Sequence, residues 1–534
     1  MKKFSFASMS FILATMFAVT GCGGGGEDQP SGVVEKDKYE ITVACQSEDS
    51  EKEVLEALKK AYEAKYPDRK INISTFTGKD FETYMLGLAQ KLDGSPNIIW
   101  TSDSYHGRWD EYFTDLRPFY EASAETDYSL YYESMLDTAA TNGYFKPTKN
   151  YTGSFRSNDK DTADGHEHYE DHSDYGLYYA PRDYNKPTLL CNTALFKQLD
   201  TQYETYVTEL SGALPANYQS ATARLNDIVA GNDWDNLDDL FAFAKMIAER
   251  IDFIVKTAED KGVEGVKVQS VWKTKTALDL KLSWEPSYVT FLTAIGATNV
   301  INSDGTLNLT ANSAALEELH AKLYPEGADR LCYAGADDTN FAQGYTFMKI
   351  VSRPVVLGFS NTFKQTYGEA SLQAIQIPVE AIAAGNSGYA INNYYHDSKI
   401  SVNGVEKSYD DICWDFIKFI ITEEGQEVAG ATGNNIPVLK SLYSAETNNG
   451  KTPAWRSVVG LEEMNQDAWV AGAELKQDWF NIYKAAARTG FRTQFQSFFA
   501  NFQKSNYNNG SLADLISNVS NGYNVLKPTQ NLLK

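Results

Sequence analysis

The feature that most constrains the fold is an alternation of strand-like and helix-like segments early in the chain. Residues 40–45 (Glu-Ile-Thr-Val-Ala-Cys) form a short apolar run typical of a buried strand. Apolar residues from 54 to 62 recur at helical spacing, and Pro67 ends that pattern. Residues 70–76 and 97–100 again have the character of strands. Because strands alternate with helices, the sequence predicts an α/β fold with a mainly parallel sheet.

Two sequences are typical of helix starts. Ser50, with Glu53 three residues later, predicts a capping box at the first helix. A second helix is expected to begin near Asn236. Its inward face is predicted to hold Leu237, Leu240, Phe241, Ala244 and Ala248.

Length and charge narrow the class of protein. A chain of 534 residues exceeds what one hydrophobic core usually supports, so two or more packed lobes are expected. The formal net charge of −23 would repel phosphate backbones and anionic surfaces. Nucleic acid is therefore not expected as a partner.

The first residues are typical of an exported protein. Lys2 and Lys3 precede an apolar run over 4–19, which is shorter than a membrane span. The run ends in a sequence resembling a lipobox, so we expect residues 1–21 to be a lipoprotein signal peptide and Cys22 to carry lipid; an ordinary signal peptide is the alternative. The glycine-rich residues 22–37 are predicted to form a flexible tether.

Residues 146–176 differ in character from their surroundings, because they are polar and almost without aliphatic side chains. We interpret them as a solvated insertion, although their His, Asp and Glu residues are of metal-binding types. Cys45, Cys191, Cys332 and Cys413 lack the short paired spacings of zinc or redox motifs. We therefore expect buried thiols, no metal site and no cofactor, with a disulfide left open.

Short motifs along the chain occur in an order typical of one family. They are residues 95–100 (Ser-Pro-Asn-Ile-Ile-Trp), 116–118 (Leu-Arg-Pro), 179–196, 234–237 (Trp-Asp-Asn-Leu), 341–348, 415–420 and 433–438 (Gly-Asn-Asn-Ile-Pro-Val). In this order the chain, from about Lys38 to its C-terminal region, resembles the family-1 extracellular solute-binding proteins of the maltose-binding type. The chain departs from the family pattern at Cys191 and Thr193, and at Arg353-Pro354-Val355, where many relatives carry a ligand-stacking Pro-Trp.

The resemblance implies a periplasmic-binding-protein-like fold of two α/β lobes with a hinge between them and the ligand in the cleft. Residues 38–184 and 376–425 are expected to form lobe 1. Residues 185–375 and 426–534 are expected to form lobe 2.

The site is predicted from strand ends and from the resemblance. Sugar sites combine aromatic platforms with carboxylates and amides, and such residues follow several predicted strands. Glu48 and Asp49 either meet the ligand or favour the helix N-terminus. The remaining candidates placed by resemblance are Trp100, Asp103, Asp183, Asn185, Trp284, Glu285, Tyr288 and Trp455. Phe359 or Asn361 is expected to contribute in place of the missing Pro-Trp.

The resemblance implies the substrate-binding component of an ABC importer, which captures a sugar or oligosaccharide without turnover. We expect a monomer, lipid-anchored at the outer face of the cytoplasmic membrane, with permease subunits as partners. A secreted glycoside hydrolase is the competing class, since it needs two carboxylates across a cleft, which Glu48, Asp103 and Glu285 could supply. A surface glycan-adhesion lipoprotein is a third.

Overall fold

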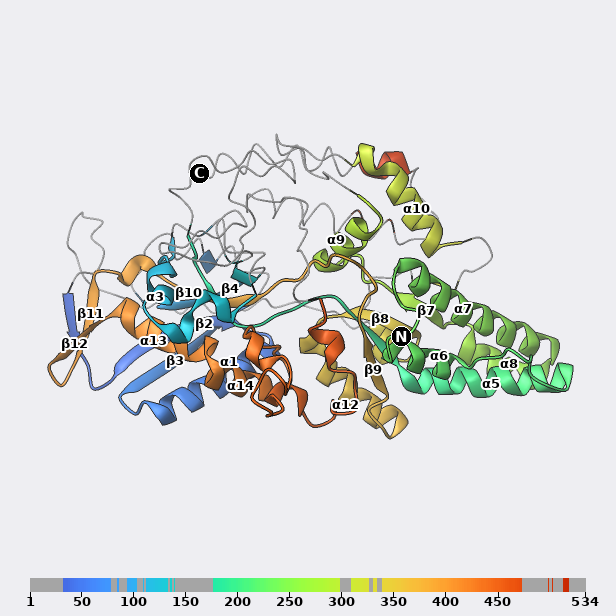
Figure 1. Cartoon of the computed structure of the whole chain (residues 1–534), viewed down its shortest axis with the longest axis horizontal. Coiled ribbons are helices and arrows are strands. Elements are labelled where there is room, and N and C mark those ends of the chain that lie inside the picture. Colours follow the sequence, from blue (N-terminus) through green and yellow to red (C-terminus); the bar gives the residue numbers. More distant parts are fainter. Residues whose placement is uncertain are drawn as a thin grey trace, which may run out of the picture.

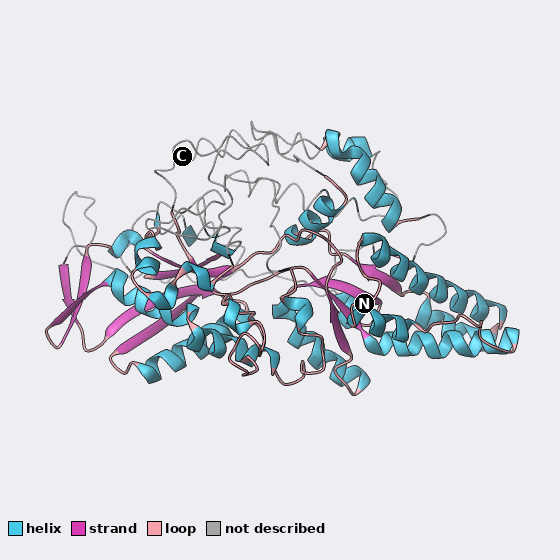
Figure 2. Ribbon diagram, viewed as in Figure 1, coloured by secondary structure: helices cyan, strands magenta, loops and turns pink. Residues whose placement is uncertain are grey.

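A computed structural model describes residues 32–77, 84–85, 94–102, 109, 112–132, 135–136, 139, 176–297, 309–325, 330–333, 339–472, 498, 502 and 512–517. The described elements form two groups that lie side by side along the long axis of the molecule (Figure 1). Each group contains a sheet with helices packed on it (Figure 2). We call the sheet containing β2 and its helices the first lobe, and the sheet containing β6 and its helices the second lobe.

The described strands are β1 (Gly32–Glu35), β2 (Tyr39–Gln46), β3 (Arg69–Phe76), β4 (Ile98–Ser102), β5 (Ala180–Pro181), β6 (Thr188–Asn192), β7 (Thr276–Asp279), β8 (Thr346–Val351), β9 (Leu372–Ile375), β10 (Ser387–Ile391), β11 (Ser398–Val402) and β12 (Val405–Ser408). The α-helices are α1 (Asp49–Lys65), α3 (Arg117–Glu121), α5 (Thr193–Ser211), α6 (Ala221–Val229), α7 (Leu237–Asp260), α8 (Val263–Trp272), α9 (Glu285–Ala294), α10 (Ser313–Leu323), α11 (Thr339–Ala342), α12 (Val356–Tyr367), α13 (Tyr409–Ile421) and α14 (Glu423–Ala431). Short 3-10 helices are η3 (Ala124–Thr126), η4 (Tyr128–Leu130), η7 (Thr310–Asn312), η8 (Arg353–Val355), η9 (Asn393–Tyr395), η10 (Lys440–Leu442), η11 (Ala454–Arg456) and η12 (Asp467–Trp469).

The sheet of the first lobe has the order β3-β2-β4-β10-β5. Strand β2 is parallel to β3 and to β4, whereas β10 is antiparallel to β4 and β5. Helices α1 and α13 pack on this sheet, and their apolar faces join its strands in one hydrophobic core. The predicted strands over 40–45, 70–76 and 97–100 and the α/β class are therefore confirmed, but the prediction of a mainly parallel sheet is wrong, because β10 is antiparallel to both of its neighbours.

The capping box predicted at Ser50 and Glu53 is wrong. Glu48 is the N-cap of α1, and its side chain makes no capping hydrogen bond. Since β2 ends at Gln46, the helix begins at Asp49 and Ser50 already lies in its first turn. The Glu53 carboxylate accepts a hydrogen bond from Asn434 Nδ2 at 3.1 Å.

The sheet of the second lobe has the order β7-β8-β6-β9, and β6 is antiparallel to both of its neighbours. Helix α7 starts with a capping box in which Asn236 and Asp239 bond reciprocally. Its buried face includes the five residues predicted to point inward, together with Ile247, Ile251 and Ile254, and it packs in a second hydrophobic core.

Three stretches of chain lie between the lobes. The first runs from β5 to β6, and the second runs from β9 to β10. Residues 432–472, the bridging segment, contact both lobes, because Asn434 bonds Glu53 of α1 and the Asn465 amide bonds Gln373 Oε1 of β9 at 2.5 Å. The predicted lobe boundaries stay predictions, and we note that α14 continues across the one placed at 425/426.

The chain before β2 is held to the first lobe. Strand β1, at the end of the predicted tether, runs parallel to β11 in a small sheet with β12. Cys22 and the predicted signal peptide lie outside the described residues. Across the part of the chain that the structure describes, no helix has both the length and the apolar character needed to cross a bilayer.

Candidate functional site between the lobes

The carboxyl ends of the parallel strands in the first lobe carry the first predicted site residues. Strand β2 ends at Gln46, and Glu48 and Asp49 follow it with exposed side chains. Since the Glu48 side chain does not cap α1, its carboxylate is available to a ligand. Asp103, predicted at the end of β4, lies outside the described residues.

Trp100 lies on β4 and is 5% exposed. Its ring centroid is 6.3 Å from that of Phe76, and its register partner on β10 is Tyr389. These contacts place the indole in the core of the first lobe. A stacking role for Trp100 stays a prediction, and it would require the ring to be uncovered.

A buried charge network surrounds the first connection between the lobes. The Arg182 guanidinium donates to both carboxylate oxygens of Glu51, at 2.9 and 3.0 Å, and to Asp183 Oδ2 at 2.7 Å. Asp183 also accepts hydrogen bonds from the Ser387 amide at 2.6 Å and hydroxyl at 2.9 Å. Although burial opposes the charge, Glu51 and then Asp183 raise the pKa of Arg182 well above its usual value.

The network joins α1, the first connection and β10, and it occupies both oxygens of Asp183. The contacts therefore favour a structural role for Asp183, and its predicted contact with a ligand stays a prediction. The next candidate, Asn185, bonds Gly385 through backbone atoms in both directions, at 2.9 and 2.7 Å. Its side chain is half-buried.

In the second lobe, the predicted Trp-Glu-Pro-Ser-Tyr segment forms the start of α9. Trp284 is the N-cap, with a half-buried side chain and Lys281 Nζ 5.8 Å from its ring. Glu285 begins the helix, but its side chain is not among those that the structure describes. Tyr288 is fully buried in the core of the second lobe. Trp284 is thus the described side chain of this segment best placed to meet a ligand.

The remaining predicted residues lie near the bridging segment. Trp455 is 1% exposed, and its Nε1 donates to the Leu442 carbonyl at 2.8 Å. Asn361 is exposed on α12. As for Trp100, a stacking role for Trp455 stays a prediction that would require the indole to be uncovered.

Arg353, where the family pattern has Pro-Trp, is buried. Its guanidinium donates to the carbonyls of Gly433 at 3.2 Å and Trp455 at 3.0 Å, and to Gln466 Oε1 at 2.9 Å. The rings of Trp455 and Trp469 lie 5.7 and 5.5 Å from it. Burial, and then Arg456, lower its pKa below the usual value. The sequence shows that this position departs from the family pattern. It does not show that Arg353 joins the end of β8 to the bridging segment.

Asn435 is a residue that sequence reasoning missed. Its side chain is fully buried in the bridging segment, and neither Oδ1 nor Nδ2 has a hydrogen-bond partner among the described residues. An unsatisfied buried polar atom costs about 1–3 kcal/mol, so each such group requires an explanation, and a bound ligand is one. The neighbouring Ile436 carbonyl accepts from the Tyr184 amide at 2.9 Å, which places Asn435 beside the first connection.

No group of three or more metal-ligating side chains occurs within the described ranges. The predicted insertion at 146–176 lies outside them apart from Gly176. Cys45, Cys191, Cys332 and Cys413 are free and buried. These four residues therefore form no disulfide with one another, which was left open by the sequence.

Comparison with known proteins gives the class of fold. No family model matches the chain, and no curated protein matches it. Among solved structures, the sugar-binding protein MalE of Xanthomonas citri is similar with a TM-score of 0.58 at 12% identity, over 92% of this chain and 99% of that one. The GacH receptor of Streptomyces glaucescens has a TM-score of 0.56 at 12% identity, over 92% and 98% of the two chains.

A third similar structure is an ABC substrate-binding protein of Listeria monocytogenes in complex with cycloalternan, with a TM-score of 0.55 at 12% identity, over 92% of this chain and all of that one (100%). At these identities the likeness establishes the fold. The chain therefore has the two-lobed fold of the maltose-binding type of solute-binding protein, which confirms the predicted architecture.

Proposed function

We propose that this chain is the substrate-binding component of an ABC importer and that it captures a carbohydrate between its lobes. The observation that carries the proposal is the match of fold over nine-tenths of the chain to proteins described as binding maltose, cycloalternan and tagatose. Ligands of α/β proteins bind at the carboxyl ends of strands and between domains, and Glu48 lies at the carboxyl end of β2. Binding without turnover is the proposed activity.

The polar residue offered to the sugar is Glu48 at the end of β2, and Asn435 in the bridging segment is proposed as a second contact that requires its buried side chain to be uncovered. A carboxylate accepts hydrogen bonds from hydroxyl groups, and an amide both donates and accepts. Trp284 presents a half-buried indole, suited to the apolar C–H face of a sugar. Glu285 and Asp103 remain proposed contacts from the sequence.

The wider setting is proposed from the sequence. Residues 1–21 are proposed to be removed and Cys22 to carry a lipid, which would hold the protein at the outer face of the cytoplasmic membrane, beside permease subunits. The protein is proposed to be a monomer. Lobe 1 is proposed to comprise residues 38–184 and 376–425, and lobe 2 residues 185–375 and 426–534. Mass spectrometry that finds an unmodified N-terminus elsewhere than Cys22 contradicts the anchor.

Calorimetry of the full chain against mono- and oligosaccharides, amino acids and peptides tests the proposal. We expect heat with a saccharide, and we expect Trp284→Ala to weaken binding roughly thirtyfold, or about 2 kcal/mol. Glu56→Gln, an exposed carboxylate change elsewhere on α1, is the control and should leave affinity unchanged. A peptide that binds tightly while no saccharide does would overturn the proposal.

A further inference from the structure

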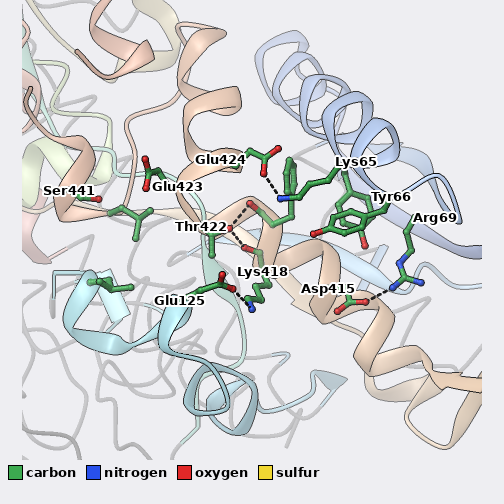
Figure 3. A pocket seen from close by; sticks show the side chains of 14 residues that line it. Lys65, Tyr66, Arg69, Glu125, Asp415, Lys418, Thr422, Glu423, Glu424 and Ser441 are labelled. Carbon is green, nitrogen blue, oxygen red and sulfur yellow. Dashed lines mark hydrogen bonds and ion pairs between the residues drawn. The ribbon is translucent and has the colours of Figure 1, made fainter. Parts of the chain in front are cut away.

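A pocket of about 500 Å³ opens on the first lobe (Figure 3), beside the last turn of α1 and the first residue of β3, and therefore at the end of the sheet opposite to the carboxyl end of β2. Helix α1 starts at the carboxyl end of β2 and runs back to the amino end of β3. The pocket is lined by the last turn of α1, the first residue of β3, the end of α13, the first turn of α14, one residue each of η3 and η4, and Leu439 and Ser441 of the bridging segment. A molecule bound here would contact the first lobe and the start of the bridging segment, at a distance from the carboxyl end of β2.

The charges around the pocket compensate one another. Lys65 pairs with Glu424, Arg69 Nη2 lies 2.7 Å from Asp415 Oδ2, and Lys418 Nζ lies 2.5 Å from Glu125 Oε2 (Figure 3). Each lining cation is thus paired, so the pocket offers no free positive charge to an anion.

One lining carboxylate remains. Glu423 is exposed in the first turn of α14 and has no ion-pair partner among the described residues. The neighbouring lining residue Ser441 is also exposed, and its hydroxyl can donate and accept. The polar groups that the pocket can offer are therefore hydrogen-bonding groups for a ligand rich in hydroxyls.

Aromatic side chains also line the pocket. The Tyr66 ring, in a residue that is 37% exposed, lies 5.0 Å from the ring of Tyr62, and Tyr62 lies 5.5 Å from Phe419. Aromatic faces cover the apolar C–H surface of a sugar, while a nearby carboxylate binds its hydroxyls. The volume lies within the range of small-molecule sites, about 300–1,000 Å³.

We propose that this pocket is a second binding site, which takes a neutral oligosaccharide through stacking on Tyr66 and hydrogen bonds to Glu423. The site is separate from the predicted cleft of the proposed import function, because its lining residues belong to the first lobe, apart from Leu439 and Ser441 at the start of the bridging segment. Binding here does not require the lobes to close.

Calorimetry of the full chain with maltotriose, backed by crystals soaked in the same sugar, tests the site. We expect a binding event that Tyr66→Ala and Glu423→Gln each weaken by about tenfold or more, and sugar density against Tyr66. Tyr345→Ala is the matched control, because Tyr345 is 43% exposed and lies outside the pocket. It should leave every binding event unchanged.

The outcomes separate the pocket from the cleft. If the cleft alone binds maltotriose, one event remains that neither Tyr66→Ala nor Glu423→Gln changes, and the inference is wrong. If the pocket alone binds it, the single event disappears in both variants and the inference holds. If pocket variants leave all sugar binding intact but weaken stimulation of the transporter, the pocket is a protein contact and the inference fails.

Discussion

Two buried arginines hold the connections between the lobes in opposite ways. Arg182 and Arg353 are both 1% exposed. Arg182 faces two carboxylates, Glu51 and Asp183, whereas Arg353 is bound by two carbonyls, one amide oxygen and two indole rings, with no carboxylate among its described partners. The pKa of Arg182 is accordingly raised despite burial, and that of Arg353 is lowered by burial.

The difference shows how burial of a charge is offset at each connection. A buried cation loses its hydration, and paired carboxylates restore more of that energy than neutral oxygens do. We therefore expect the first connection to be rigid. The bridging segment, held to β8 by the less compensated Arg353, is expected to move first when the lobes rotate.

The largest expected effect is at Arg182. Arg182→Met leaves Glu51 and Asp183 buried without their cation, which should lower the free energy of unfolding by about 3–5 kcal/mol. Urea unfolding followed by circular dichroism measures the loss. A decrease below about 1 kcal/mol, the level of a surface pair, would show that the network is not buried in solution.

The same substitution at Arg353 should cost less. Arg353→Met removes a poorly compensated charge and leaves neutral acceptors without a donor, so we expect a loss of about 1–3 kcal/mol in the same urea experiment. A loss as large as that of Arg182→Met would contradict the contrast between the two arginines.

An intermediate case is the pair of His396 Nδ1 and Asp410 Oδ2, 2.6 Å apart. The hydrogen bond to Asp410, and then its charge, raise the pKa of His396. A raised pKa in the folded state gives stability that is complete below the ordinary value of about 6.5 and is lost as pH rises through the folded value.

His396→Gln should therefore lower the melting temperature below about pH 6 and have progressively less effect at higher pH. Because the His396 side chain is 63% exposed, solvent screening limits the loss to less than about 1 kcal/mol. Scanning calorimetry at several pH values measures it. A difference from the parent that does not vary with pH would refute this assignment.

The smallest effect is expected at an exposed pair. Lys197 Nζ lies 2.8 Å from Glu369 Oε1, with side chains 60% and 54% exposed. Lys197→Met should change the free energy of unfolding by no more than about 0.5 kcal/mol. A loss of several kcal/mol would contradict the assumption that the stabilising effect of a charged side chain increases with its burial. The predictions for Arg182, Arg353 and His396 depend on that assumption.

The sequence predicts local structure well where one periodicity dominates. The strand over 40–45 and the inward face of α7 were predictable because apolar residues recur with the period of the element. The start of α1 was not, because Ser50 and Glu53 match a capping pattern, whereas the pairing of β2 with β3 ends at Gln46 and the helix begins at Asp49, one residue before Ser50. The pairing of β2 with β3, a contact between separate segments, determines where the strand ends, and the spacing of residues within one segment does not show it.

The site depends on contacts between distant residues. Arg182 lies 131 residues from Glu51, so the sequence offered no spacing that would join them. Resemblance pointed to Trp100 and Trp455, but their burial follows from packing against Phe76, Leu442 and Arg353. Asn435 sat within a matched motif, yet its unsatisfied amide becomes visible only when its neighbours are known.

The most direct test of the central claim is a crystal structure of the full chain with the saccharide that binds most tightly in calorimetry. We predict sugar density between the lobes, in contact with Glu48 of the first lobe and Trp284 of the second, with the lobes rotated about the bridging segment. A crystal with no sugar between the lobes, and with the lobes placed as in the free protein, would contradict the account.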